Sequence, residues 1–158
     1  MKKNVIYLVL SFLFILSCHS EEKENLNRNA SVKQSDELLE NPLLMTPITS
    51  SVQPKDSTIS TLYGNKAAAA YAKMNSDSKY PEGAVLYEVT WKQKPDELWF
   101  GANIPKEIFS VEKVIFQNRD LHKYEIYMGK PLKKKSLFKD EELSRISFIT
   151  SQKMAVSP

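Results

Sequence analysis

The sequence is poor in the residues that make covalent cross-links and metal centres. Its 158 residues include one cysteine, Cys18, and two histidines, His19 and His122. One cysteine cannot form an intrachain disulfide or a thiolate metal cluster, and it cannot supply the C-x-x-C-H motif that attaches haem covalently. The carboxylates show no metal-ligand spacing, and no nucleophile-elbow, zinc-protease, P-loop or dinucleotide-binding motif is present. We therefore predict no metal site and identify no catalytic residues.

The sequence also lacks a strong excess of charge of either sign. Its formal net charge is +3, and two of those units belong to Lys2 and Lys3. The remainder is close to neutral, which does not favour nucleic acid as a partner. A basic run, Lys133–Lys135, has no interleaved aromatic residues and is typical of a solvated loop. The composition, 26% charged and 42% hydrophobic, is that of one globular domain.

The N-terminus has the pattern of a targeting segment. Lys2 and Lys3 precede the apolar run Val5–Leu16, whose twelve residues are too few to span a bilayer comfortably. The run ends in Ile15-Leu16-Ser17-Cys18, which resembles a bacterial lipobox. We therefore predict a lipoprotein signal peptide over residues 1–17, with Cys18 acylated and inserted in the bilayer of the cell envelope. The alternatives are an ordinary signal peptide or an uncleaved anchor with a coincidental cysteine.

Residues 18–56 have the composition of a tether. The segment is rich in charged and amide side chains at its start and carries Pro42, Pro47 and Pro54. Such a composition buries too little apolar surface to offset the entropy of ordering the chain. We predict a disordered tether over 18–56 and a folded domain over 57–158. A short helix over Ser35–Leu44 is the alternative.

Strand patterns dominate the stretch Tyr80–Phe116. Alternation over Ala84–Trp91 predicts a half-buried strand with Glu88 on its solvent face. Further strands are predicted over 98–103, 111–116 and 123–128.

One helix is predicted from Lys66 to Asn75, capped by Asn65, with Ala67, Ala70, Tyr71 and Met74 on its buried face. The segment Asp140–Thr150 fits a helix or a strand. The predicted fold class is α+β, an antiparallel sheet of four to five strands flanked by an N-terminal helix, with a C-terminal helix as an open alternative.

The order and spacing of several short pieces carry a family resemblance. They are Leu62-Tyr63-Gly64-Asn65 before an alanine-rich helix, then YPEGAVL, W-K-Q, WFGANIP and SVEKVIF within residues 80–116. This series resembles the cytochrome P460 domain, a family of secreted bacterial haem proteins, over roughly Thr61–Phe116. The family attaches haem through a late C-x-x-C-H motif, which this sequence lacks. A family lysine is also crosslinked to the haem, and neither Lys66 nor Lys73 aligns with it.

The residues that remain as candidates for a ligand pocket are aromatic. Trp91, Trp99 and Phe100 lie in or next to predicted strands, and His122 precedes another. Together they would line an apolar cavity, with His122 as the one imidazole able to ligate haem. The alternatives are aromatic residues of the core and a surface or packing histidine.

Three functions follow from these patterns. The first is a membrane-anchored lipoprotein whose P460-like domain is free of haem and binds a small ligand or an envelope protein, without enzymatic activity and without a cofactor. The second, implied by the resemblance, is a protein that holds haem non-covalently and performs redox chemistry on hydroxylamine or nitric oxide. The third is a structural envelope protein. Fold likeness alone does not choose among them.

Overall fold

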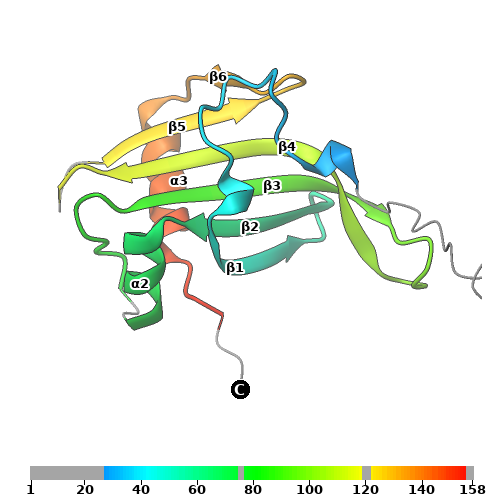
Figure 1. The fold of residues 1–158 in the computed structure, drawn as a ribbon, viewed down its shortest axis with the longest axis horizontal. Helices are drawn as coiled ribbons and strands as arrows, with labels where there is room; N and C mark the ends of the chain where they lie inside the picture. Colours follow the sequence, from blue (N-terminus) through cyan, green and yellow to red (C-terminus); the bar gives the residue numbers. More distant parts are fainter. Residues whose placement is uncertain (1–26, 75–76, 119–121, 156–158) are drawn as a thin grey trace, which may run out of the picture.

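A computed structural model describes residues 27–74, 77–118 and 122–155. In these ranges the chain forms one antiparallel sheet of six strands that follow one another in sequence order (Figure 1). The strands are β1 Thr46–Gln53, β2 Thr58–Gly64, β3 Val85–Pro95, β4 Asn103–Phe116, β5 His122–Met128 and β6 Lys133–Lys135. The helices are the short 3-10 turns η2 Arg28–Ala30 and η3 Pro42–Leu44, and the α-helices α2 Lys66–Met74 and α3 Lys139–Ser151.

The predicted α+β class is confirmed, but the predicted strand count and helix placement are wrong. The sheet has six strands instead of four to five, and α2 follows β2 instead of opening the domain. The missed strands β1 and β2 have the sequences TPITSSVQ and TISTLYG. Their threonine, isoleucine and valine residues favour extended backbone, while their many hydroxyls give the stretch the polarity of a linker. β6 forms within the lysine run that was predicted to be a loop.

Residues 27–56 do not have the structure of a tether. Besides β1, they contain a segment over residues 27–45, here called the cover segment, which packs on one face of the sheet (Figure 1). Ala30 accepts a 2.8 Å hydrogen bond from Trp91 Nε1. Glu40 Oε2 accepts one of 2.7 Å from the Tyr87 hydroxyl. The average composition of the cover segment is polar, but a few of its apolar side chains, Leu38 above all, are buried against the sheet and hold the segment there.

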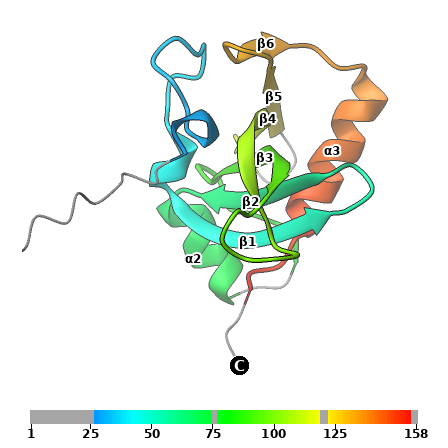
Figure 2. The ribbon, with the colours of Figure 1, turned by 90° about the vertical axis from the view of Figure 1, so that its right-hand side faces the viewer.

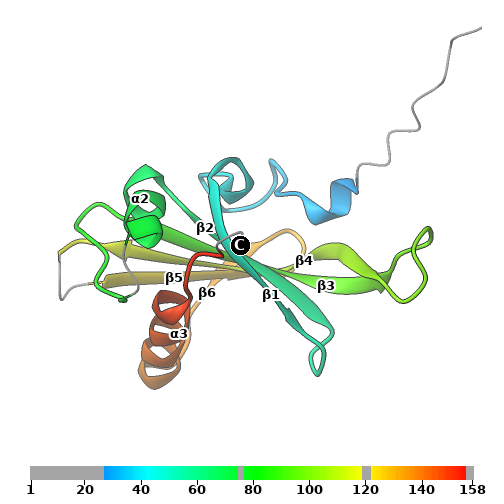
Figure 3. The ribbon, with the colours of Figure 1, turned by 90° about the horizontal axis from the view of Figure 1, so that it is seen from below.

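The opposite face of the sheet is covered in part by α3. Ile146 and Ile149 of this helix pack with Leu86 and Val114 of the sheet. Figures 2 and 3 show α3 and the cover segment on opposite sides of the strands. Because both faces are covered, side chains that alternation assigns to solvent are buried. The prediction that Glu88 faces solvent is therefore wrong, since its exposed fraction is 1%.

β3 and β4 extend beyond the rest of the sheet as a long hairpin (Figure 3). The predicted strand over 98–103 is wrong, because residues 96–102 form the connection and β4 begins at Asn103. The backbone N–H of Asp96 donates to the Ala102 carbonyl at 2.9 Å, which closes this loop. Gly101 has a φ of 80°, a conformation that glycine adopts at no steric cost. The predicted strand over 111–116 is the second half of β4.

α2 begins where the sequence predicts but buries a different face. Asn65 Oδ1 accepts a 3.0 Å hydrogen bond from the Ala68 N–H, which confirms the predicted cap. The buried residues are Ala68, Ala69 and Ala72, whereas Met74, predicted to be inside, is 84% exposed. The helix follows β2 directly, and Ala68 and Ala69 lie on its side that approaches Gly64 closely.

Candidate ligand-binding cavity

A polar cavity of about 520 Å³ lies on the face of the sheet that α3 covers only in part. Strands β2, β3 and β4 form its floor, and one side of α3 forms a wall. Its lining residues are Gln53, Asp56, Thr58, Ser60, Glu88, Thr90, Lys92, Phe109, Ser110, Glu112, Arg145 and Phe148. The volume is within the range of small-molecule sites, about 300–1,000 Å³.

Two buried carboxylates face each other in the floor of the cavity. The register of the sheet places Glu88 of β3 directly opposite Glu112 of β4. Their exposed fractions are 1% and 4%. Like charges at directly opposite positions of adjacent strands destabilise a sheet, and burial increases the cost of each charge. The pair is therefore held by interactions with other groups.

Arg145 of α3 compensates the carboxylate pair. Its Nε donates to Glu112 Oε2 at 2.8 Å, and its Nη2 donates to Glu112 Oε1 at 2.8 Å. The same Nη2 lies 3.6 Å from Glu88 Oε2. The planar guanidinium thus forms a bidentate pair with one carboxylate and an ion pair with the other, a geometry that lysine cannot provide.

Two further side chains complete the hydrogen bonding. The Tyr124 hydroxyl donates to Glu112 Oε2 at 2.6 Å. Gln152, just beyond α3, donates from Nε2 to Glu88 Oε2 at 2.9 Å. Glu112 is therefore bound by Arg145 and Tyr124 on both oxygens, whereas Glu88 has the weaker set of partners. Of the two carboxylates, Glu88 is the one that remains able to respond to a ligand.

The electrostatics of the cavity separate Glu88 from an ordinary glutamate. The pKa of Glu88 is raised, chiefly because the side chain is buried, and the charge of Glu112 raises it further. The charge of Arg145 and the hydrogen bonds from Ser60 and Gln152 lower the pKa, but they do not offset burial. Burial would lower the pKa of Arg145, but its contacts with Glu112 more than offset this and raise it. Glu88 therefore binds a proton more readily than a solvated glutamate, and the guanidinium stays charged.

The rest of the cavity supplies hydrogen-bonding groups and two aromatic rings. Hydroxyl groups come from β2, β3 and β4 at Thr58, Ser60, Thr90 and Ser110. Two cations stack on the rings at the rim. The Lys92 ammonium lies 4.2 Å from the Phe109 ring centroid, and the Arg145 guanidinium 4.8 Å from that of Phe148. Such an arrangement can bind a polar molecule through several hydrogen bonds while its apolar part contacts a ring.

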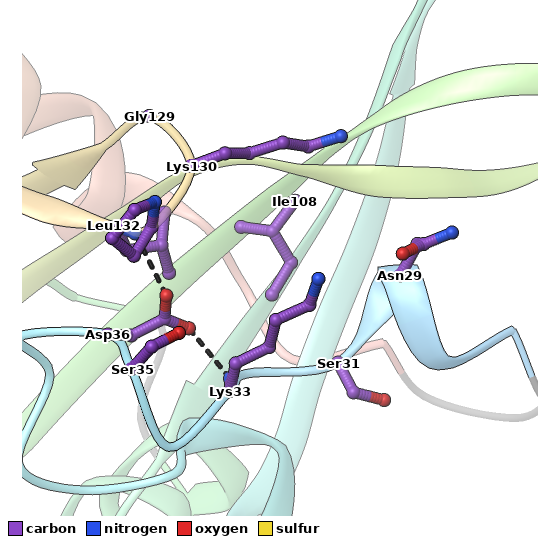
Figure 4. A pocket seen from close by; sticks show the side chains of 10 residues that line it. Asn29, Ser31, Lys33, Ser35, Asp36, Ile108, Gly129, Lys130 and Leu132 are labelled. Atoms are coloured by element: carbon purple, nitrogen blue, oxygen red, sulfur yellow. Dashed lines mark hydrogen bonds between the residues drawn. The ribbon is translucent and has the colours of Figure 1, made fainter.

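A second, smaller cavity of about 170 Å³ lies between the cover segment and the turn that joins β5 to β6 (Figure 4). Its central carboxylate, Asp36, accepts the Leu132 N–H at 2.8 Å and the Lys33 N–H at 2.7 Å. One oxygen of Asp36 thus attaches the cover segment to the connection between β5 and β6, and the other closes a turn within the cover segment. This cavity has a structural role, and the larger one is the candidate site.

The structure does not bring the four sequence-predicted ligand residues together. Trp91 is buried beneath the cover segment, whereas Trp99 and Phe100 are exposed at the end of the β3–β4 hairpin. The His122 ring packs on Phe116 with centroids 4.7 Å apart, and its Nδ1 is buried without a hydrogen-bond partner among the described residues. Cys18 lies outside the described residues.

Sequence reasoning missed the residues that define the cavity. Glu88, Glu112 and Arg145 are far apart in sequence and match no motif. The one signal was Glu88, which lies between apolar residues of its predicted strand. That signal was interpreted as a solvated face, because it becomes informative only when the register and the covering helix are known.

No protein-family model and no curated protein matches this chain. The resemblance to cytochrome P460 domains therefore stays a prediction. Over residues 27–74, 77–118 and 122–155, no group of three or more histidine, cysteine or acidic side chains is arranged to hold a metal ion. No helix in these ranges has the length and apolar character needed to cross a membrane.

Proposed function

We propose that this chain is a lipid-anchored binding protein of the bacterial cell envelope. Acylated Cys18 attaches it to the bilayer, and the cavity in front of Glu88 and Arg145 binds a small polar molecule that carries an ammonium group. The scaffold resembles cytochrome P460 domains and functions without covalent haem. The observation that carries the proposal is the buried Glu88–Glu112 pair in the floor of the cavity.

The balance of charge in the cavity favours a cationic ligand. Three carboxylates line it, from Asp56, Glu88 and Glu112, against two cations, from Lys92 and Arg145. The guanidinium is already bound to both oxygens of Glu112. An ammonium group next to Glu88 would therefore neutralise a desolvated carboxylate that no bidentate partner compensates. The neighbouring hydroxyls would then hydrogen bond to the polar remainder of the ligand.

The anchor is supported by the sequence around Cys18. This cysteine is the only one in the chain, and it follows Ile15-Leu16-Ser17 at the end of a signal-like apolar run. Two or three acyl chains provide stable attachment where one gives only reversible binding. We expect membrane fractionation to depend on Cys18, with Cys18→Ser removing the acyl mass.

Ligand binding is tested with three probes that differ in charge: ethanolamine, glucose and acetate. We expect ethanolamine to raise the melting temperature of the wild type and to lose this effect in Glu88→Gln. The matched control is Glu125→Gln, which removes a carboxylate on the opposite face of the sheet. An ammonium group favours the ionised form of Glu88, so affinity should fall as the pH is lowered through its raised pKa.

The outcomes separate the classes of ligand. Stabilisation by acetate or glucose alone, equal in the wild type and Glu88→Gln, would refute the ammonium proposal.

Haemin is added as a fourth probe, because the resemblance to cytochrome P460 domains implies a haem ligand. We expect no Soret band that depends on His122, since this ring packs on Phe116 and does not line the cavity. A sharp band that disappears in His122→Ala would favour the non-covalent haem protein.

A further inference from the structure

The end of the β3–β4 hairpin presents three apolar side chains to solvent. Leu98 and Trp99 are 84% and 72% exposed, and Phe100 is fully exposed. These residues, with Gly101, are here called the hairpin tip. Elsewhere the large aromatic side chains of the sheet are mostly buried, so three consecutive exposed apolar residues at a protruding end are unusual for a soluble surface.

The first described residue of the chain is attached at the base of this hairpin. Asn27 Nδ2 donates to the carbonyls of Pro105 and Lys106, each at 2.8 Å. Figures 1 and 3 show η2, which follows Asn27, beside the part of β4 that enters the hairpin. The chain therefore leaves the folded part at the same end of the molecule as the hairpin tip.

The length of chain between Cys18 and Asn27 limits how far the hairpin tip can be from the bilayer. These nine residues reach at most about 32 Å when fully extended. Pro105 follows Phe100 by five positions, so the tip lies at most about 17 Å from the attachment point, the length of five residues at the rise of a strand. The chain from Cys18 to Asn27 is thus long enough for the tip to touch the bilayer that holds the acyl chains.

We infer that the hairpin tip is a second membrane contact, inserted at the interface of the same bilayer that anchors Cys18. This inference rests on the proposed acylation of Cys18. Tryptophan and phenylalanine favour the headgroup level of a bilayer, where an apolar ring meets polar surroundings. Lys94 and Glu97 pair at 3.9 Å just behind the tip, so they can remain in the hydrated headgroup layer. Two contacts would fix the orientation of the domain on the membrane.

The two tryptophans of the chain make the contact directly measurable, because Trp91 is buried while Trp99 is at the tip. The full lipidated protein is reconstituted into vesicles of phosphatidylethanolamine and phosphatidylglycerol whose acyl chains carry bromine near the headgroup. We expect the bromine to quench part of the wild-type emission and to leave Trp99→Phe unquenched. Leu98→Ser combined with Phe100→Ser should reduce the quenching of Trp99. The matched control, Phe138→Ser, changes an exposed aromatic residue at the start of α3 and should have no effect.

Each remaining outcome overturns the inference in a distinguishable way. If mass spectrometry shows acylated Cys18 but brominated lipid quenches the wild type no more than Trp99→Phe, the tip contact is absent while the anchor stands. If Cys18 carries no acyl mass, both the anchor and the inference fail. If Trp99 is shielded in proportion to protein concentration and is not quenched by bromine, a second copy of the chain occupies the tip.

Discussion

At the scale of single residues, the unusual feature is a pair of glutamates that would repel each other in isolation. Glu88 and Glu112 are buried and directly opposite, and one arginine from a helix far away in sequence contacts both. A buried ion pair is not by itself evidence of stabilisation, because hydrophobic residues of the same volume often do as well. Its position in a cavity is the reason that we propose a ligand site there.

Removing Arg145 should destabilise the fold severely. Arg145→Ala leaves two buried carboxylates without a cation, and we expect a loss of about 2–4 kcal/mol in the free energy of unfolding. This expected loss is smaller than that for breaking a fully buried ion pair, because the Arg145 side chain is 36% exposed. Chemical denaturation at neutral pH measures it. The loss should shrink at acidic pH, where protonated carboxyl groups no longer need a countercharge.

Two variants control for this experiment. Lys139→Ala removes an exposed cation from the same helix and should change stability by less than about 0.5 kcal/mol. Arg145→Lys keeps the charge but loses the bidentate geometry, so it should be intermediate. A neutral effect of Arg145→Ala at pH 7 would show that the carboxylates are solvated or protonated in the folded protein.

Glu125 should make stability depend on pH in the opposite sense from Glu88. Burial would raise its pKa, but hydrogen bonds from Lys134, Lys123 and Tyr127 prevail and lower it from 4.5 to about 2. The stabilisation is present above pH 4.5 and is lost as the pH falls toward 2. Because both lysines are half exposed, we expect Glu125→Gln to cost only about 1–2 kcal/mol at pH 7.

The measurement compares urea unfolding of wild type and Glu125→Gln from pH 7 down to the acid limit. The two curves should converge as Glu125 becomes protonated. The contrasting variant is Glu88→Gln. The pKa of Glu88 is raised, so the folded state binds the proton more tightly than the unfolded state does. The contribution of Glu88 to the free energy of unfolding therefore declines as the pH rises from 4.5 through that raised pKa. A constant difference between wild type and Glu125→Gln at all pH values would contradict the assigned ion pairs.

At the scale of elements, the position of α2 depends on a glycine at the end of β2. A Cβ on Gly64 would lie 2.8 Å from Ile48 Cδ1 and 2.9 Å from Ala68 Cβ. Both distances are shorter than carbon atoms tolerate, and the Ala69 backbone nitrogen at 3.2 Å leaves little room to shift. A side chain at residue 64 would therefore force Ile48 or α2 to move.

Gly64→Ala should therefore separate α2 from β1 at a cost of about 1–3 kcal/mol. Thermal unfolding by circular dichroism measures the loss, and a cooperative transition at a lower temperature is expected. Ala70→Ser, on the exposed side of the same helix, is the control and should be nearly neutral. An unchanged melting temperature in Gly64→Ala would mean that α2 is not packed at this distance.

The elements also show what sequence patterns can and cannot predict here. The residue range of α2, though not its place after two strands, was predicted correctly because Asn65 and four alanines act locally, and that of β5 because its alternation is strong. The buried face of α2 was predicted only in part: Tyr71 packs on the core as expected, but the alanines that are buried, Ala68, Ala69 and Ala72, are on the side that approaches Gly64. The cavity was missed because Glu88, Glu112 and Arg145 meet only through strand register and the packing of α3, which are non-local.

At the scale of the whole molecule, the sheet needs covers on two faces, and one of them is not a regular element. The cover segment contributes Leu38 to the cluster that contains Tyr87, Trp91 and Leu132. It is attached through Asp36 to the Leu132 N–H and through Glu37 Oε2 to the Lys134 N–H, both at 2.8 Å. A domain boundary at residue 57 would remove this cover together with β1.

Truncation tests whether the cover segment belongs to the cooperative unit. A chain that begins at Thr46 exposes Tyr87, Val89 and Trp91, whose burial contributes about 1.5–3 kcal/mol each. That sum is comparable with the whole stability of a small domain, about 5–15 kcal/mol, so we expect loss of cooperative unfolding and a red shift of Trp91 emission.

A chain that begins at Asn27 keeps the cover segment and should unfold cooperatively. Trp91→Phe in that chain removes the hydrogen bond to Ala30 and part of a buried ring, and should cost about 1–3 kcal/mol. If the chain from Thr46 unfolded cooperatively at an unchanged temperature, the segment would be an independent attachment, and the single-domain description would have to begin at β1.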